Sequence, residues 1–435
     1  MDRLEIGFAS IAVLLVLMAL RVPVAVAIAA VAFGGTWLII GLGGAWGIVT
    51  TIPYTFVSNW NLSAIPMFLL MGFIASQSGL TKGLFSEFRH LFRKVPGGLA
   101  SATVLSAALF STASGSSVAT AAAFSRIAVP EMLKAGFKPS LATGVVASAG
   151  TLGSLIPPSV GLIIFGIITE TSISHLFVAG IIPGILTALM YFAMITIRVI
   201  VNPSLAPRGE KRSEPKSIWR VVAEIWPLPV LILGVMGGIF AGIFTPTEAG
   251  AVGAFLAFII ALARGALKKE VVIRALADTA VGTCTLFLVA MAAAMFAVFL
   301  GLAGVPNAVS DLATTYIQGP VMLILLLAVI YLVMGMFVDS IGVMILTLPV
   351  LMPLLTDMNI NMIWVGIIVM KLLEMGLLTP PVGLNIFVVK SSLGDAVKLQ
   401  DIFKGAAWFL LADVFTFGLI VAFPLLSLFL PGLMD

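Results

Sequence analysis

Charged residues are scarce in this chain of 435 residues, where Asp, Glu, Lys and Arg together make up 10%. A soluble domain carries roughly 25%, and even a large core leaves a wide surface to cover. The composition therefore excludes a soluble enzyme, a disordered chain, a nucleic-acid binder and a fibrous repeat. Hydrophobic residues make up 61%, and the mean hydropathy is +1.20. They form continuous runs and not the alternating strands of an outer-membrane barrel, so we expect an all-α polytopic membrane protein.

Cysteine and histidine are almost absent. A single cysteine, Cys284, excludes an internal disulfide and a cysteine metal cluster. Two histidines, His90 and His175, are too few for a histidine-rich metal site. The chain has no G-x-x-x-x-G-K-[ST] phosphate loop and no H-E-x-x-H motif. We expect a protein that is not an enzyme and that holds no tightly bound cofactor.

Runs of about 20 apolar residues, long enough for a helix to cross a bilayer, recur along the chain. They lie near residues 4–20, 22–42, 61–80, 140–169, 176–200, 219–243, 248–263, 278–302, 362–390 and 405–431. The first run ends at Arg21 and has no convincing cleavage signal, so we expect it to remain as a span. Two further stretches, 97–133 and 320–355, are too long for one span, and small or polar residues interrupt both.

The few basic residues indicate the orientation. All Lys and Arg except Arg3, Arg126 and Lys371 fall at Arg21 or in the clusters 82–94, 134–138, 198–220, 264–274 and 390–404. Basic loops are usually cytoplasmic. With the basic clusters in the cytoplasm, successive connections alternate between the two sides of the membrane only if each of the two long stretches enters and leaves the membrane on the same side. Stretch 97–133 dips in from the cytoplasm and 320–355 from outside, with both termini outside.

A repeat relates the two halves of the chain. Ser116, Pro130 and Pro157-Pro158 recur as Asp339, Pro353 and Pro380-Pro381, each 223 residues later. The segments after the double prolines, VGLIIF and VGLNIF, also match with one residue deleted. Because the copies enter from opposite sides, we predict an inverted repeat, a common architecture of secondary transporters.

Two motifs in the repeat offer ligands for ions. The segment Ser111–Ser117 (STASGSS) suits a chain reversal inside the membrane. Its hydroxyls and freed carbonyls suit Na⁺, and the N–H groups of a half-helix suit a carboxylate. The double prolines break a helix and free the carbonyls before them. Helix packing and a plain kink are the alternatives, but the recurrence of the double proline after a re-entrant stretch in both copies favours binding.

Ionisable residues at membrane depth are costly and usually functional. Asp339 lies in the middle of the second stretch, and we interpret it as functional. Lys371 and Glu374 lie three apart on the next helix, and they form either a functional pair or an internal ion pair that holds this helix to its neighbour. Arg126 is interpreted as a packing or interface residue. Asp413 and Glu248 receive no role.

These features together resemble one family. The Ser-x-x-Ser-Gly-Ser-Ser tip, the Gly-x-x-x-Pro-Pro helices and the segment Gly335–Asp339 (GMFVD) are similar to the large membrane subunit of tripartite ATP-independent periplasmic (TRAP) transporters. The resemblance implies two re-entrant helical hairpins and two broken helices within elevator-type transport and scaffold domains. Scaffold spans would occupy 1–80 and 171–280, the latter with cytoplasmic loops. The transport-domain repeats would occupy 97–170 and 320–390, and a C-terminal span 405–431.

The resemblance also implies site residues, with Na⁺ as the coupling ion. The first Na⁺ site would use Ser111, Ser114, Gly153, Ile156 and Pro158. The second would use Gly335, Gly376, Thr379 and Val382. Several of these are apolar because they contribute backbone carbonyls. The substrate is expected to contact Ser116, Ser117, Asp339, Ser340 and Asn385.

The function expected from this resemblance is Na⁺-coupled import of a small organic anion across the bacterial inner membrane. A C4-dicarboxylate, sialic acid and other carboxylates are all compatible. The implied partners are a small four-helix membrane subunit, which is not fused to this chain, and a periplasmic substrate-binding protein. Membrane lipids surround the chain, and no nucleic acid is expected. The alternative is a stand-alone sodium/dicarboxylate symporter without a binding protein, and an intramembrane enzyme or a channel is less favoured.

Overall fold

The computed structural model describes residues 2–20, 22–80, 82–207, 222, 224–316 and 319–434. In these residues every regular element is a helix, as the continuous apolar runs predict. The predicted end of the first span at Arg21 and most of the basic cluster 198–220 lie outside the described residues. The helices are α1 (Arg3–Ala19), α2 (Val24–Val57), η1 (Trp60–Ser63), α3 (Ala64–Gln77), α4 (Lys82–Leu91), α5 (Gly98–Ser114), α6 (Ser117–Lys134), α7 (Pro139–Ala149), α8 (Leu152–Leu155), α9 (Val160–Ile168), α10 (Ile173–Val201), η2 (Pro203–Leu205), α12 (Pro227–Phe240), α13 (Pro246–Ala263), α14 (Lys269–Ala303), α15 (Val305–Tyr316), α16 (Pro320–Gly335), α17 (Ser340–Asp357), α18 (Met362–Gly376), α19 (Leu384–Leu393), η3 (Gly394–Ala396), α20 (Leu399–Ala422), α21 (Leu425–Leu428) and η4 (Pro431–Leu433).

Many of these helices suit a bilayer. Within the described residues, seven are long and apolar enough to cross one, and α7–α8 together with α9 pass the same test as a pair bent by 43°. Large apolar side chains such as Leu38, Leu233 and Leu411 are exposed on their surfaces. Such exposure is expected where the surrounding solvent is lipid, because lipid tails are as apolar as leucine.

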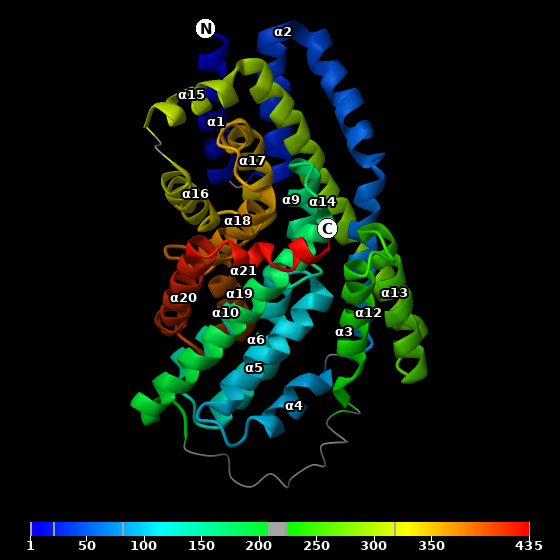
Figure 1. Cartoon of the computed structure of the whole chain (residues 1–435), viewed down its shortest axis with the longest axis vertical. Coiled ribbons are helices and arrows are strands. Elements are labelled where there is room, and N and C mark those ends of the chain that lie inside the picture. Colours follow the sequence, from blue (N-terminus) through cyan, green and yellow to red (C-terminus); the bar gives the residue numbers. More distant parts are fainter. Residues whose placement is uncertain are drawn as a thin grey trace.

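The two long stretches are pairs of helices. Stretch 97–133 contains α5 and α6, and stretch 320–355 contains α16 and α17. Figure 1 shows the first pair in the lower half of the molecule and the second pair in the upper half. The repeat partners identified in the sequence therefore occupy matching elements in two separate parts of the fold.

Two helices lie where the run lengths indicated only connections. They are α4 and α15, which lie at opposite ends of the molecule in Figure 1. Each follows a glycine with positive φ, Gly79 at +76° and Gly304 at +75°. Both helices have an apolar and a polar face, so a search for uninterrupted apolar runs does not find them.

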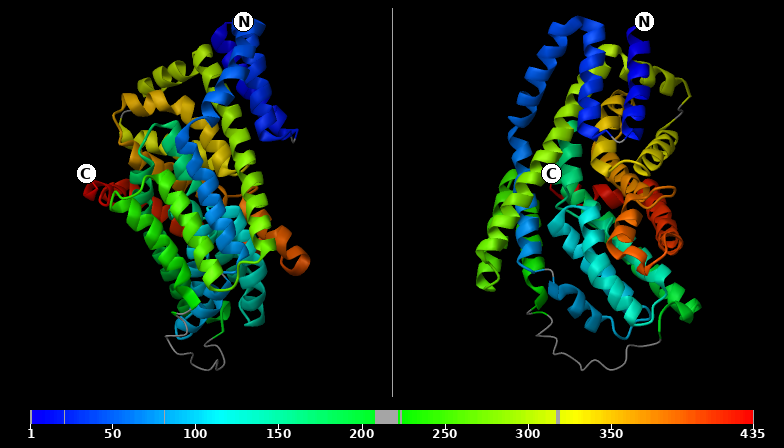
Figure 2. Two further views of the ribbon diagram at one scale, coloured as in Figure 1. Left: turned by 90° about the vertical axis from the view of Figure 1, so that its right-hand side faces the viewer. Right: turned by 180° about the vertical axis from the view of Figure 1, so that it is seen from behind.

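The connection expected at 42–60 is also largely helical. α2 continues to Val57, but Gly41 has φ +82° and ψ 171°, which a helix does not permit. The chain therefore turns sharply at Gly41, and Figure 2 shows the resulting arch with one arm running beside α14. Ile48, Val49 and Ile52 on this arm pack against the apolar cluster shared by α1, α2 and α14. This packing stabilises a helical conformation in 42–60, where the sequence showed only a connection without charged residues.

Candidate functional site

The second helix of each pair begins in the same way at the tip. In the first, Gly115 adopts φ +60°, and Ser116 caps α6 by accepting a hydrogen bond from the Ala119 N–H at 3.3 Å. In the second, Asp339 caps α17 by accepting a hydrogen bond from the Gly342 N–H at 3.1 Å. Ser116 and Asp339 are repeat partners, so the two residues differ in type but share the capping role.

Each helix pair is followed by a helix that breaks at a double proline. The first break separates α8 from α9 around Pro157-Pro158, and the second separates α18 from α19 around Pro380-Pro381. Both Pro–Pro peptide bonds are cis. The first pair of prolines is buried and the second is exposed. The two breaks therefore share a cis Pro–Pro bond, but the first is buried in the protein and the second is exposed.

The first break lies against the tip of the first helix pair. A Cβ on Gly153 would lie 2.4 Å from the Ser111 Cβ, so only glycine permits this approach. The buried Ser111 hydroxyl donates to a carbonyl of its own helix at 2.8 Å, which leaves its oxygen lone pairs available. The other expected ligands of the first Na⁺ site are Ile156 and Pro158, on the break itself, and Ser114, whose side chain lies outside the described part of the structure.

The second break lies against the tip of the second pair in a similar way. A Cβ on Gly376 would lie 2.8 Å from the Gly335 Cα. The Thr379 hydroxyl donates to the Met375 carbonyl at 2.7 Å and keeps its lone pairs available. Val382 follows in the non-helical segment before α19. Hydroxyl oxygens beside an interrupted backbone suit Na⁺ at both places, and the assignment of these ligands stays a prediction.

A cavity of about 470 Å³ lies where the two tips meet α3 and α14. Its wall includes four of the five residues expected to contact substrate, and Ser154 adds a further hydroxyl. The four are Ser116, Ser117, Asp339 and Ser340. Among the described residues that line it, none is Lys or Arg. A second cavity of about 360 Å³ has an apolar lining apart from Asn59, so it offers few groups to an anion.

The fifth expected residue, Asn385, is not among the described residues that line the larger cavity. It is fully buried at the start of α19, where its Nδ2 donates to the Ala147 carbonyl at 3.2 Å. Its Oδ1 has no hydrogen-bond partner within the described structure. Asn385 therefore connects α19 to α7, and its contact with substrate stays a prediction.

Glu374 of α18 connects the two tips behind the cavity. This residue is 3% exposed, and its carboxylate accepts hydrogen bonds from the Ser117 hydroxyl at 2.7 Å and the Ser340 hydroxyl at 3.3 Å. Ser117 and Ser340 are repeat partners and begin α6 and α17. The sequence reasoning missed this role, although the 223-residue offset makes the two serines equivalent and could have indicated a shared partner.

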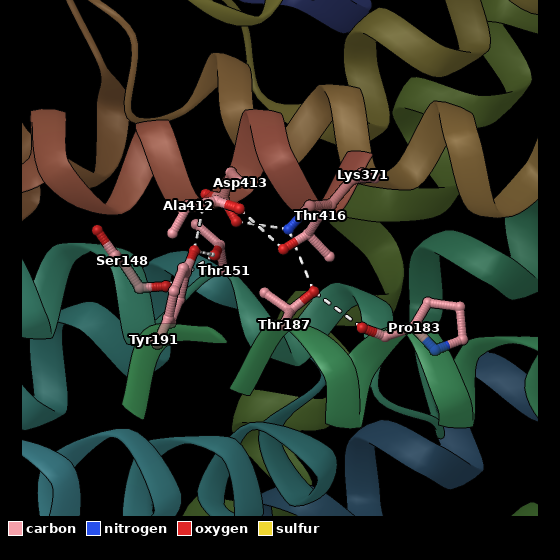
Figure 3. A network of polar contacts seen from close by, with 9 residues as sticks. All are labelled: Ser148, Thr151, Pro183, Thr187, Tyr191, Lys371, Ala412, Asp413 and Thr416. Carbon is pink, nitrogen blue, oxygen red and sulfur yellow. Dashed lines mark hydrogen bonds and ion pairs between the residues drawn. The ribbon is translucent and has the colours of Figure 1, made fainter. Parts of the chain in front are cut away.

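Lys371 pairs with Asp413 and not with Glu374. The Lys371 Nζ lies 2.5 Å from the Asp413 carboxylate, and both side chains are almost fully buried. As Figure 3 shows, Lys371 also donates to the Thr187 hydroxyl at 3.2 Å, and the Tyr191 hydroxyl donates to Asp413 at 2.7 Å. An ion pair does hold α18 to a neighbouring helix, but the partner suggested by the helix spacing, Glu374, was wrong, and Asp413 had received no role. Residues three apart on a helix can turn to different neighbours once other helices pack around them.

Residues 11–426 of this chain match the sequence profile of one protein family. That family is described as "Tripartite ATP-independent periplasmic transporter, DctM component". The chain belongs to this family. The TRAP resemblance of the tips and broken helices is thereby confirmed. The protein is a membrane permease component of a TRAP transporter, located in the bacterial inner membrane with several spans, and it is not an enzyme.

Curated relatives support the TRAP assignment along nearly the whole chain. The C4-dicarboxylate TRAP transporter large permease protein DctM of Pseudomonas aeruginosa is 31% identical, over 90% of this chain and 93% of that protein. The sialic acid TRAP transporter permease protein SiaT of Haemophilus influenzae is 29% identical, over 92% of this chain and 67% of that longer protein.

A solved structure supports the fold of this TRAP permease. The Alcanivorax borkumensis YdaH transporter aligns with a TM-score of 0.63 and 17% identity, over 89% of this chain and 90% of that one. At this identity the likeness shows the fold alone. It agrees with an all-helical transporter with several spans.

Proposed function

We propose that this TRAP permease subunit imports a small organic anion together with Na⁺, after a periplasmic binding protein delivers the anion. The observation that carries the proposal is the meeting of two repeat-related tips and two helix breaks around one cavity. The hydroxyls and interrupted backbones there suit Na⁺, and the helix N-termini of α6 and α17 suit a carboxylate. The ligand sets are the two Na⁺ groups and the substrate residues named above.

An elevator mechanism follows from the repeat. In this proposal the transport domain comprises 97–170 and 320–390, which are related by an inverted repeat. The spans in 1–80 and 171–280 form the scaffold, with 405–431 as the C-terminal span. The cavity supports this division, because its wall combines α3 of the scaffold, and α14, which begins in the scaffold, with both tips of the transport domain.

The substrate class and the partners follow from the relatives. Those named above carry a C4-dicarboxylate and sialic acid, so we propose a carboxylate solute for this chain. SiaT has about a third of its length outside the match, which is room for a fused second component. We propose that a separate small four-helix membrane subunit takes that place beside this chain.

Uptake into proteoliposomes tests the coupling. The chain is reconstituted with its small membrane subunit and its binding protein, and labelled succinate or sialic acid is supplied with an inward Na⁺ gradient. We expect uptake that requires the gradient and saturates with solute. Uptake indifferent to Na⁺ would contradict the coupling, and uptake without any binding protein would favour the stand-alone symporter.

Two substitutions test the proposed site residues in the same assay. Ser114→Ala removes a proposed Na⁺ ligand, and Asp339→Asn removes the charge that caps α17 at the cavity wall. Each should lower uptake at least tenfold while the amount of purified protein changes little. Ser106→Ala and Asp357→Asn are matched controls on α5 and α17 and should transport like the wild type. Wild-type rates for both test variants would remove these two residues from the site.

A further inference from the structure

Three hydroxyls of the cavity wall have no proton left for an incoming anion. A serine hydroxyl has one proton, and Ser117 and Ser340 each donate theirs to Glu374, at 2.7 and 3.3 Å. The Ser154 Oγ lies 2.7 Å from the Ser117 Oγ. Because the Ser117 proton is committed to Glu374, Ser154 donates in that pair. All three serines line the cavity, and they present oxygen lone pairs to it.

The charge of Glu374 is also left without a fixed counter-charge. Within the described structure it forms no ion pair with Lys or Arg, because the nearby Lys371 is already paired with Asp413. The cavity wall adds a second acid, Asp339. The N-termini of α6 and α17 offset part of the charge of Glu374, with about half a charge at each helix end. A buried carboxylate remains costly without a full partner.

We propose that Ser117, Ser154, Ser340 and Glu374 form a Na⁺ site, distinct from the groups at Gly153 and Gly376, and that the ion binds there before the organic anion. This inference rests on the proposed function and adds an ion position to it. Three hydroxyl oxygens and one carboxylate oxygen contact the ion, and a carboxylate of the solute completes the coordination.

This arrangement makes anion binding conditional on the cation. Without Na⁺, a solute carboxylate faces serine lone pairs and the negative field of Glu374, so it is repelled. With Na⁺ in place, the same wall carries a positive charge that the carboxylate can contact directly. The site therefore explains physically why anion binding depends on Na⁺. The bound ion changes a cavity wall of hydrogen-bond acceptors into one that attracts an anion.

Binding of ²²Na⁺ without organic solute tests the site. The complex of this chain and its small membrane subunit is placed in lipid nanodiscs, and bound ²²Na⁺ is measured against concentration for wild type, Glu374→Gln and Glu87→Gln. Glu87 is a matched control, because it is also a buried glutamate but belongs to α4, whereas Glu374 belongs to α18 and accepts hydrogen bonds from two serines of the cavity wall. We expect Glu374→Gln to bind one ion fewer, or to bind that ion at least tenfold more weakly, while Glu87→Gln matches the wild type.

If Glu374→Gln does not fold, two variants of Ser340 still test the proposal. Ser340→Ala removes one ligand oxygen and should weaken Na⁺ binding at least threefold, whereas Ser340→Thr keeps the hydroxyl and should restore it. A purely structural role of Ser340 would change thermal stability without this split in Na⁺ affinity. Unchanged ²²Na⁺ number and affinity in Glu374→Gln, or equal affinity in Ser340→Ala and Ser340→Thr, would overturn the proposal.

The experiments distinguish an error in this additional Na⁺ site from an error in the proposed function. If wild-type uptake needs the Na⁺ gradient and Glu374→Gln binds ²²Na⁺ normally, only the additional ion position is wrong. If wild-type uptake does not respond to Na⁺, the proposed coupling itself is wrong, whatever the variants do.

Discussion

Three acidic side chains that the sequence places at membrane depth are each stabilised in a different way. Asp339 caps α17, Glu374 accepts hydrogen bonds from two serines, and Asp413 pairs with Lys371. Taking a charge out of water costs several kcal/mol unless a partner or hydrogen bonds compensate. The partner of each acid therefore determines its role: a cap, a candidate ion ligand and a structural ion pair.

The Lys371–Asp413 pair yields a stability prediction at the residue scale. Lys371→Met leaves Asp413 buried without a counter-charge and should destabilise the protein by about 3–5 kcal/mol. The double variant Lys371→Met with Asp413→Leu removes both charges and should be roughly neutral relative to the wild type. Unfolding of the purified protein in detergent measures both. A double variant as unstable as the single one would show that the charges are not coupled.

At the scale of elements, helices come close where glycines replace side chains. α7 and α20 meet at Gly144 and Gly405, and a Cβ on Gly405 would lie 1.8 Å from the Ser140 carbonyl oxygen. The same device brings α2 to α14, where a Cβ on Gly35 would lie 2.3 Å from the Phe299 ring. Small residues allow the close van der Waals contact that holds membrane helices together. The contact between α7 and α20 keeps the first broken helix against the last long span.

The α7–α20 contact can be tested with two glycines of one helix. Gly405→Val forces the two backbones apart and should destabilise the protein by about 1–3 kcal/mol, the usual cost of overpacking. Gly418→Val, also on α20, has open space around its added side chain and should be near neutral. Thermal unfolding in nanodiscs compares the pair. Equal losses in both variants would mean that valine in the helix, and not the contact, causes the effect.

At the scale of the whole molecule, the cavity joins parts that the proposed mechanism moves past each other. Its wall contains Val118 on α6, within the proposed transport domain, and Thr285 on α14, a helix that begins in the proposed scaffold. A link between these two positions would hold one conformation. Such a link would therefore test whether transport requires α6 to move relative to α14.

Cross-linking therefore tests the elevator proposal. Cys284→Ser gives a chain without cysteine, and Val118→Cys with Thr285→Cys then provides the two attachment points. A flexible bis-maleimide should reduce uptake to the level of empty liposomes, because the transport domain can no longer shift. Each single-cysteine variant treated with the same reagent should keep most of its uptake. Normal uptake by the fully linked protein would contradict movement between these parts.

The sequence alone was sufficient for the membrane class, the pairs of helices at 97–133 and 320–355, the breaks at the double prolines and the family. These depend on local properties: apolar run length, backbone freedom at glycine and proline, and an offset between copies. The amphipathic helices α4 and α15 and the helical arm after Gly41 were not found, because uninterrupted apolar runs do not describe them.

Only the tertiary structure decided which buried polar groups meet. Lys371 and Glu374 are neighbours on one helix, yet one turns to Asp413 of α20 and the other to Ser117 and Ser340. A side chain at membrane depth is stabilised by whatever the surrounding helices place within its reach, and that depends on packing between segments hundreds of residues apart. The scarcity of charge follows from composition, but the partner of each remaining charge is a property of the fold.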